Sequence, residues 1–288
     1  MFTDRINNSV EEIKYGKDVS FLYNNFFGRI ILKVIYNRFI SNIIGIYMNS
    51  SLSKGRINKT IKKYNIDMSI FEKKEYKSFN EFFIRYKKEL NFDMDKNHFV
   101  SPCDSKLTVI KLDEDTSFKV KGSLYNMKNI IDEDISKDYK NGYALIFRLE
   151  INNYHHYHFV DDGTIGKNKY IKGVLHTVQP IALGKYKVFH KNAREYTVLH
   201  TKNFGDIIQV EVGALSVGRI TNNKNIKFFK KGEEKGYFEF GGSTVILFVK
   251  DKSVFIDKDI LNNSKKGIET VVNCGEKIGI KYKVDKKK

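Results

Sequence analysis

The spacing of apolar residues changes near residue 95, and this change constrains the possible fold more than any other feature. Before it, apolar side chains recur at helical spacing, as in Phe79, Phe82, Phe83 and Tyr86. After it, they alternate with less apolar neighbours in short runs at 118–120, 143–151, 208–212 and 281–284, the pattern of half-buried strands. We therefore expect an α+β protein, with a helical region at 1–95 followed by a predominantly antiparallel β region at 96–288.

Two helices are expected before residue 95. The first covers 56–64, where Ile57, Ile61 and Tyr64 share a face. The second begins at Ser78, because a serine followed three residues later by Glu81 forms a capping box. Its apolar spacing predicts that this helix continues to about Leu90.

The stretch at 21–48 is rich in Phe, Ile, Leu and Tyr but has no uninterrupted apolar run of about 18 residues. A transmembrane helix is therefore not expected. On a helix, polar residues at every fourth position would form one narrow stripe, made of Asn25, Arg29, Lys33, Asn37 and Ser41. This pattern fits either a core helix with one solvated edge or a helix lying in a membrane interface with its cations at the headgroups.

The chain is strongly basic, with 51 Lys and Arg against 34 Asp and Glu, a formal net charge of +17. Such a balance favours a polyanionic partner. No nucleic-acid-binding motif is present, so an acidic membrane surface is the preferred partner and nucleic acid is not expected. The two cysteines, Cys103 and Cys274, indicate a reducing compartment. No signal-peptide pattern opens the sequence.

Two glycines interrupt an apolar, strand-like run at 238–248, and Ser243 follows them directly. Gly241 and Gly242 fit a β-turn between two strands. They also fit a strained turn in which the Ser243 hydroxyl attacks the carbonyl group of Gly242, because glycine admits such backbone conformations. The local pattern does not decide between the two interpretations.

Three of the seven histidines lie within five residues, at positions 155, 156 and 158. Histidine changes charge near neutral pH, so this cluster indicates proton transfer or metal binding. On a regular strand, His156 and His158 share one face and His155 points to the other. No Cys or matched Glu nearby completes a ligand set, and we expect no metal. Asp104 follows the turn at Pro102, where an aspartate most often caps or bends the backbone.

Several stretches, taken in order, resemble the phosphatidylserine decarboxylases, pyruvoyl enzymes that convert phosphatidylserine into phosphatidylethanolamine. The resemblance covers roughly residues 50–280. Two residues depart from the family pattern: Ser105 replaces a usual glycine, and Gly241 stands where many members have leucine. The stretches that carry the resemblance are SFNEFF at 78–83, SPCD at 101–104, YHHYH at 154–158, VEVGA at 210–214, KGYF at 235–238, GGST at 241–244 and GEKIG at 275–279.

The resemblance implies a self-processing enzyme. Ser243, His158 and Asp104 would be the nucleophile, the base and the carboxylate that orients the base. The Ser243 hydroxyl would attack the Gly242 carbonyl, and cleavage between 242 and 243 would convert Ser243 into a covalent pyruvoyl group, the only cofactor expected. The pyruvoyl group would form a Schiff base with phosphatidylserine and release CO2. His155 is the expected proton donor to the decarboxylated carbon.

The resemblance also implies the partners: phosphatidylserine, an anionic membrane surface bound by the 1–95 region, and a heterodimer of the cleaved large and small chains, with homo-oligomers left open. The expected location is the cytoplasmic face of the cell membrane, as a peripheral protein. Three alternatives stay open. They are a metal-dependent hydrolase that uses the histidine cluster, a non-catalytic lipid-binding module, and a pyruvoyl decarboxylase of a soluble amino acid.

Overall fold

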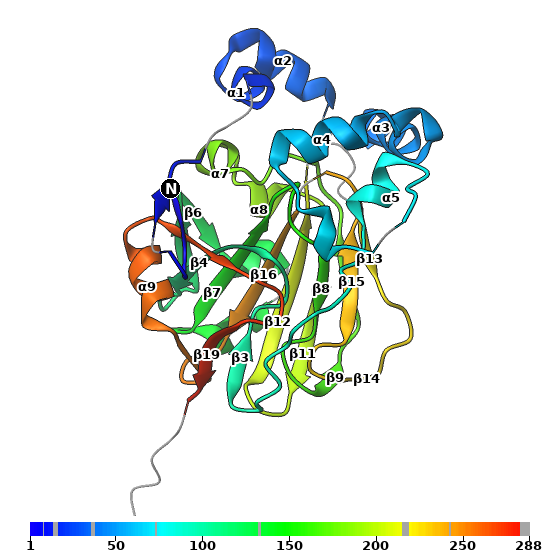
Figure 1. The fold of residues 1–288 in the computed structure, drawn as a ribbon. Helices are drawn as coiled ribbons and strands as arrows, with labels where there is room; N and C mark the ends of the chain where they lie inside the picture. The colour runs from blue at the N-terminus through cyan, green and yellow to red at the C-terminus, as the bar shows by residue number, and fades with distance from the viewer. Residues whose placement is uncertain are drawn as a thin grey trace, which may run out of the picture.

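The structure is a computed structural model that describes residues 1–7, 9–13, 17–35, 38–72, 74–131, 134–214, 219–241 and 243–282. Figure 1 shows the N-terminal helices gathered at one end of a body built mainly of strands. The strands pair antiparallel with one exception, so the α+β prediction is confirmed. The N-terminal helices are α1 (Lys17–Asn24), α2 (Phe26–Ile35), α3 (Arg38–Asn49), α4 (Arg56–Tyr64) and α5 (Phe79–Phe83).

The stretch at 21–48 is not one continuous helix. Asn25 lies between α1 and α2, and its side-chain oxygen accepts the backbone N–H of Phe27 at 2.9 Å, so it begins a new helix. The prediction of a single polar stripe along one helix is therefore wrong at Asn25, the first residue of the stripe. Asn37 and the side chains of Lys33, Arg38 and Ser41 lie outside what the structure describes.

The predicted helix 56–64 is confirmed as α4, and Ser78 does cap α5, accepting the backbone N–H of Glu81 at 3.2 Å. The Glu81 carboxylate accepts the N–H of Lys77, one residue earlier than a capping box places it. Helix α5 ends at Phe83, and the predicted extension to Leu90 is wrong. The chain turns there to pair Phe71 with Lys87 through an isolated β-bridge.

The largest sheet runs in the order β14-β9-β11-β12-β16-β7-β4-β18-β1-β2. Its long central strands pair with their neighbours along most of their length. The short strand β1 pairs with β18 in parallel. Their bounds are β14 (Phe228–Phe229), β9 (Gly163–Ile165), β11 (Arg194–Thr201), β12 (Gly205–Gly213), β16 (Ser243–Val249), β7 (Tyr143–Leu149), β4 (Ser105–Lys111), β18 (Glu269–Val272), β1 (Phe2–Asp4) and β2 (Val10–Glu11), with β10 (Lys169–Ile171) beside β11.

Three smaller sheets and several short helices cover this one. The sheets are β13 (Ile220–Asn222) with β15 (Glu234–Phe238) and β8 (His156–His158); β17 (Val254–Ile256) with β19 (Lys277–Lys281) and β3 (His98–Val100); and β5 (Ser117–Val120) with β6 (Ser123–Asn126). The remaining helices are α6 (Met127–Ile131), α7 (Pro180–Tyr186), α8 (Val188–Lys191) and α9 (Lys258–Lys265), with 3-10 turns at Ser51–Ser53, Met68–Ile70 and Asp134–Tyr139.

Strand β16 runs through the middle of the molecule between β12 and β7, with apolar cores on both sides. Ile246 and Phe248 belong to one core, and Val245 and Leu247 belong to the other. Strand β7 is buried on both faces in the same way. The half-buried strand expected at 143–151 is therefore wrong, because neighbouring layers cover the face that a simple alternation would leave in solvent.

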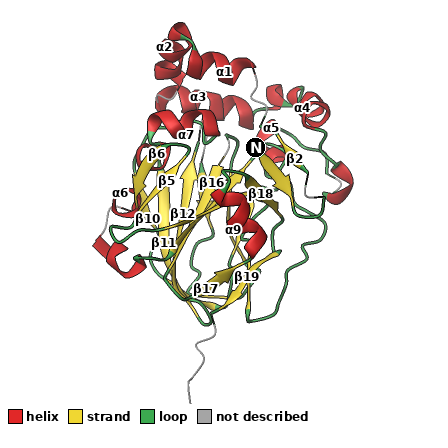
Figure 2. Ribbon diagram, turned by 90° about the vertical axis from the view of Figure 1, so that its left-hand side faces the viewer, coloured by secondary structure: helices red, strands yellow, loops and turns green. Residues whose placement is uncertain are grey.

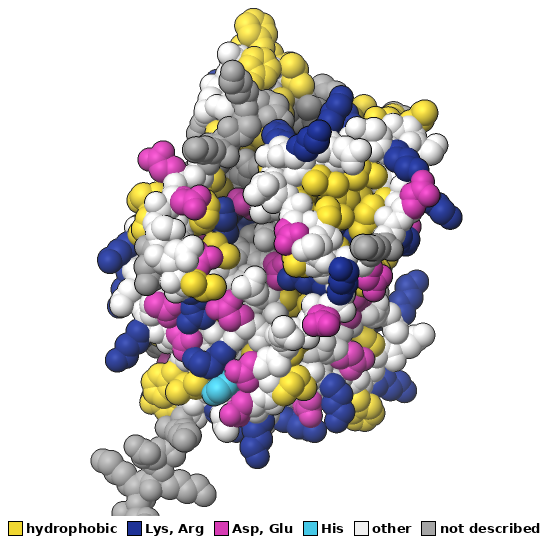
Figure 3. All heavy atoms as spheres, in the orientation of Figure 1, with side chains coloured by type: hydrophobic (Ala, Val, Ile, Leu, Met, Phe, Trp, Pro, Cys, Tyr) yellow, Lys and Arg dark blue, Asp and Glu magenta, His cyan; other side chains and the backbone are white. Residues whose placement is uncertain are grey.

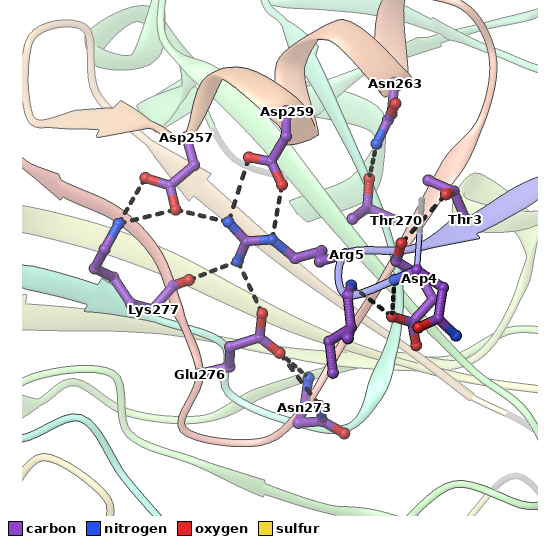
Figure 4. Close-up of polar contacts among 12 residues, drawn as sticks. Thr3, Asp4, Arg5, Asp257, Asp259, Asn263, Thr270, Asn273, Glu276 and Lys277 are labelled. Carbon is purple, nitrogen blue, oxygen red and sulfur yellow. Dashed lines mark hydrogen bonds and ion pairs between the residues drawn. The ribbon is translucent and has the colours of Figure 1, made fainter. Parts of the chain in front are cut away.

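The N-terminal segment is fixed to the C-terminal part of the chain by one arginine, shown in Figure 4. The Arg5 guanidinium pairs with Asp257 at 2.9 Å, with Asp259 at 2.7 Å and with Glu276 at 2.8 Å. It also donates to the carbonyl of Lys277 at 2.8 Å. A planar guanidinium can serve several carboxylates at once, so this contact holds β1 firmly beside β18.

Candidate active site

Ser243 is the first residue of β16 and is fully buried. It lies between Gly213 of β12 and Leu149 of β7, and its hydroxyl has no hydrogen-bond partner among the described residues. Because buried hydroxyls are normally hydrogen-bonded, an unpartnered one marks a candidate site for chemistry.

The segment before Ser243 joins two different sheets. Strand β15 ends at Phe238 in the small sheet, and β16 starts in the large one, so the segment is a crossover and not a hairpin turn. Gly241 has φ of 145°, a backbone conformation that favours glycine. Gly242 lies outside the described residues.

Helix α5 holds this crossover from one side. The Asn80 side-chain oxygen accepts the backbone N–H of Phe240 at 2.9 Å. The Asn80 amide group donates to Asn49 of α3 at 3.0 Å and to Glu239 at 3.3 Å. The ring of Phe240 packs edge-on against Phe79, with centroids 5.0 Å apart. Two residues before the candidate cleavage point, the backbone is thus fixed by the N-terminal helices.

His155 lies under the same helix. Its ring is fully buried against Phe83, with centroids 3.7 Å apart, and neither ring nitrogen has a partner among the described residues. Burial, followed by the nearby Arg85 and His156, lowers the pKa of His155 well below 6.5. His155 is therefore a neutral imidazole at pH 7, and the backbone of Asn153 is near enough to act on its pKa in the opposite direction.

His156 is occupied by the protein itself. Its Nδ1 lies 2.8 Å from a Glu234 oxygen, its Nε2 lies 3.0 Å from the carbonyl oxygen of Ile84, and its ring stacks on Tyr154. In the part of the chain that the structure describes, no group of three or more His, Cys, Asp and Glu side chains is arranged to hold a metal ion. The second histidine of the cluster thus joins β8, β15 and the end of α5.

Asp104 lies just before β4 and accepts several donors. Its carboxylate pairs with Lys87 at 2.7 Å and accepts the backbone N–H of Cys274 at 2.8 Å. The backbone N–H of Tyr154 approaches it at 3.4 Å. The carboxylate therefore joins the segment after α5, the loop after β18 and the residue before His155.

His158 contacts the same loop. Its Nδ1 lies 3.4 Å from the Cys274 sulfur, and its backbone N–H donates to Pro102 at 2.9 Å. Burial lowers the pKa of His158 to about 4. Cys274 thus contacts both Asp104 and His158. Among the described residues, no hydrogen bond joins Asp104 directly to His158, and none joins either one to Ser243.

Sequence reasoning missed three contributors to this site: Asn80, Lys87 and Cys274. In the sequence, Asn80 is only one member of the motif at 78–83, and Cys274 is only one of two cysteines. Lys87 is one of 51 basic residues and carries no local signal. Their roles depend on contacts between segments far apart in the chain, such as the 170-residue separation between Asp104 and Cys274.

Two features of the fold and the site are typical of an enzyme. A buried serine and a buried neutral histidine, each without a polar partner among the described residues, lie where a helical layer meets the central sheet. Such groups are typical of active sites, because a protein with no use for them would leave them paired or solvated.

Comparison with known proteins identifies the class more closely. The family model for phosphatidylserine decarboxylase matches residues 79–280. The chain is 49% identical over 282 residues to phosphatidylserine decarboxylase proenzyme 2 of Clostridium acetobutylicum, covering 95% of this chain and 97% of that relative. It is 45% identical to a phosphatidylserine decarboxylase proenzyme of Clostridium botulinum over 94% of this chain and 95% of the relative, and 43% identical to one of Clostridium tetani over 95% of each.

The chain belongs to the phosphatidylserine decarboxylase family, and the resemblance seen in the sequence is confirmed. It is accordingly an enzyme, a decarboxylase of phospholipid biosynthesis.

Proposed function

We propose that this chain decarboxylates phosphatidylserine to phosphatidylethanolamine, using a pyruvoyl group that it makes from its own Ser243. One observation carries the proposal: the Ser243 hydroxyl is buried and unpartnered at the start of β16, two residues after a glycine with φ of 145°. The relatives' designation as proenzymes supports a chain that must be processed.

In the proposed processing, His158 takes the proton of the Ser243 hydroxyl. With a pKa of about 4, His158 is in its basic form at pH 7. The Ser243 oxygen attacks the Gly242 carbonyl carbon, and an ester replaces the peptide bond. Elimination across Cα and Cβ of Ser243 releases the Gly242 carboxylate and leaves dehydroalanine, which water converts to the ketone and ammonia. Cys274 contacts His158, and Asp104 holds Cys274 through its backbone N–H.

A contact between His158 and the Ser243 hydroxyl has to form for this step. Hydrogen bonds of catalytic groups are often incomplete before the reacting state is reached, so the present geometry is compatible with the role. Asn80 holds the Phe240 backbone two residues before Gly242.

The residues present fit a pyruvoyl group at position 243. The unpartnered Ser243 oxygen and the buried His155 imidazole would both gain a use there. When formed, the group supplies a ketone that condenses with the substrate amine and draws electrons from the bond to the carboxylate. No metal or diffusible cofactor is required by this scheme.

In the proposed reaction, His155 accepts and donates a proton. A substrate amine arrives as an ammonium and must lose a proton before it can attack a ketone. His155 is neutral at pH 7 because burial lowers its pKa, so it can accept that proton and later return it to the carbon that loses CO2. Its stacking on Phe83 fixes the ring for both transfers.

The two chains produced by cleavage would stay together. The small chain, 243–288, supplies β16, β17, α9, β18 and β19, and three of these strands lie between or beside strands of the large chain. Strand β16 pairs with β12 and β7, β18 pairs with β4 and β1, and β19 pairs with β3. Arg5 adds ion pairs from the large chain to Asp257, Asp259 and Glu276 of the small one.

The N-terminal helices fit a membrane-docking role. Figure 3 shows apolar side chains at the surface of the helical end of the molecule. No described helix is long and apolar enough to span a bilayer. We therefore propose peripheral docking on an anionic bilayer at the cytoplasmic face. The large side chains exposed on α2, α3 and the turn after α3 are Phe26, Phe27, Ile30, Ile31, Ile43, Ile46, Tyr47 and Leu52.

Only part of residues 1–95 is proposed to dock on the membrane. Strands β1 and β2 belong to the large sheet, and α5 belongs to the active site. The docking surface is therefore confined to α1, α2, α3 and the turn Ser51–Ser53, while Tyr23 and Leu32 are buried and fix α1 and α2 to the β core. The rest of the chain, with 96–288 as its main part, forms the catalytic region.

The test combines denaturing electrophoresis, intact mass and product analysis on one purified preparation. The proposal expects two fragments, 1–242 and 243–288, the smaller one starting with a pyruvoyl group, and phosphatidylethanolamine from phosphatidylserine vesicles. An uncleaved chain with stoichiometric metal supports the hydrolase alternative. An uncleaved chain that binds vesicles without turnover supports the lipid-binding module, and decarboxylation of a free amino acid supports the soluble-substrate alternative.

A further inference from the structure

A cavity lies on the face of the central sheet opposite to the candidate active site. Its volume is about 500 Å³. Strands β4, β7 and β16 form its floor, and it opens between the β5-β6 hairpin and α9, which Figure 2 shows on either side of β16. None of Ser243, His155, His158 and Asp104 lines it.

Strand alternation separates this cavity from the active site. Thr244 lines the cavity, and successive residues of a strand point to opposite faces, so Ser243 points away from it. Thr244 is fully buried, and its hydroxyl has no hydrogen-bond partner among the described residues. The protein itself therefore leaves a polar group unsatisfied directly beneath this cavity.

The lining is apolar at the floor and walls and cationic at the rim. Val120, Ile146, Leu183, Phe189 and Leu261 supply apolar surface. The exposed rim residues are four lysines, Lys111, Lys119, Lys121 and Lys265.

The carboxylate of Glu269 does not offset these lysines. It is the only carboxylate of the lining, and Arg148 engages both its oxygens, at 3.0 and 2.6 Å. A third bond from Arg148 goes to Glu150 at 2.8 Å. The Glu269 carboxylate is therefore fully engaged by Arg148, and the rim lysines present positive charge to any ligand.

We propose that this cavity binds a single-chain amphiphile with an anionic head. The alkyl chain would lie over the apolar floor and the head would meet the rim lysines. The volume is within the range of about 300–1,000 Å³ typical of small-ligand sites, which also combine apolar walls with a few polar groups. An alkyl carboxylate and an alkyl phosphate share this chemistry. Such a ligand would contact Thr244, next to the reacting residue, without entering the active site.

The experiment is calorimetric titration of the full-length protein with dodecanoate and with dodecyl phosphate, each below its micelle concentration. Dodecanol and dodecyltrimethylammonium carry the same chain without the anion. We expect saturable 1:1 binding of at least one anionic probe, weaker binding at high salt, and little binding of the two controls. The tighter of the two anionic probes identifies the head group.

The rim lysines supply the decisive variant. Lys111→Gln, Lys119→Gln and Lys265→Gln combined should weaken the anionic probe about tenfold, since exposed charge pairs contribute about 0.2–1 kcal/mol each. A matched triple, Lys224→Gln, Lys227→Gln and Lys252→Gln, removes the same charge from exposed positions outside the cavity and should leave binding unchanged. All six positions are exposed, so folding should be preserved.

Three results would overturn the proposal: no saturable binding below the micelle concentration, equal binding of dodecanol and the anionic probes, or equal weakening by the two triple variants. None of these results bears on self-cleavage. The proposed function and this site can therefore fail separately.

Discussion

The helical end exposes side chains that are usually buried, whereas the central sheet buries groups that are usually exposed. Helices α2 and α3 expose large apolar side chains, with Phe27 at 69% and Ile46 at 73% exposure. The β core instead buries groups that normally face water, including His155 and Ser243. Each departure is unfavourable on its own, so each indicates an interaction with something beyond the folded chain. A lipid surface fits the first, and chemistry fits the second.

A short series of hydrogen bonds joins the two regions. Asn49 at the end of α3 contacts Asn80 of α5, and Asn80 holds the backbone at Phe240. The surface proposed for docking and the segment proposed for cleavage therefore share one helix as their support. The predictions below test how far the two regions can be separated.

The largest effect is expected from Ser243→Ala. Without the hydroxyl, neither the ester nor the pyruvoyl group can form, so we expect one full-length chain, no decarboxylation and unchanged vesicle binding. Electrophoresis, activity and co-sedimentation measure the three properties. Efficient cleavage of this variant would contradict the serine mechanism.

The two histidines should differ in the step that they affect. His158→Ala should accumulate precursor, cleaving on the order of 10²–10⁴-fold more slowly, the usual contribution of general-base catalysis. Asp104→Asn should act in the same direction. His155→Ala should cleave and carry a pyruvoyl group, yet turn over phosphatidylserine far more slowly. Fragment mass and product formation are measured together, and the opposite pattern for the two histidines would reverse their assigned roles.

Polar substitution of the exposed apolar residues should separate docking from chemistry. Phe27→Ser combined with Ile46→Ser should weaken vesicle binding by about 10²-fold or more, since fully burying one such side chain contributes about 1.5–3 kcal/mol. Self-cleavage should be unchanged. Arg29→Gln, also on α2, should give a smaller loss that disappears at high salt. Co-sedimentation unchanged by the double variant would remove the docking role.

Asn80→Ala should slow self-cleavage by about tenfold, because a buried hydrogen bond lost at Phe240 costs about 1–3 kcal/mol. Asn49→Ala is the matched control, since it breaks only the link to α3. If cleavage slows equally in both variants, the docking helices and the cleavage segment are coupled. If Asn49→Ala cleaves normally, Asn80 acts locally. Normal cleavage of Asn80→Ala would remove it from the site.

The smallest effect is expected from pH. A base is active when unprotonated, so a His158 with a pKa of about 4 is already in its active form at pH 5. The rate of self-cleavage should change little between pH 8 and pH 5 and fall only as pH approaches 4. With a histidine of ordinary pKa near 6.5, the rate would instead fall about 25-fold between pH 7 and pH 5. Rates measured in a pH series on freshly unfolded and refolded precursor decide between the two.

Local sequence patterns determined the class of the fold and the positions of the candidate reacting groups. The change from helical to alternating spacing, the serine cap at Ser78, and the Gly-Gly-Ser run were all readable, because each depends on neighbours within a few residues. The ordered motifs then identified the family, since they lie along the chain itself and need no knowledge of contacts.

The tertiary structure alone decided which groups are free and which are occupied. His155, His156 and His158 look alike in sequence, yet Glu234 and Ile84 occupy His156, Cys274 contacts His158, and His155 has no polar partner among the described residues. The same holds for the break at Asn25 and for β7, which is buried on both faces. These outcomes depend on strand order and layer packing, and so on contacts between segments as far apart as the 116 residues between His158 and Cys274, which no local pattern specifies.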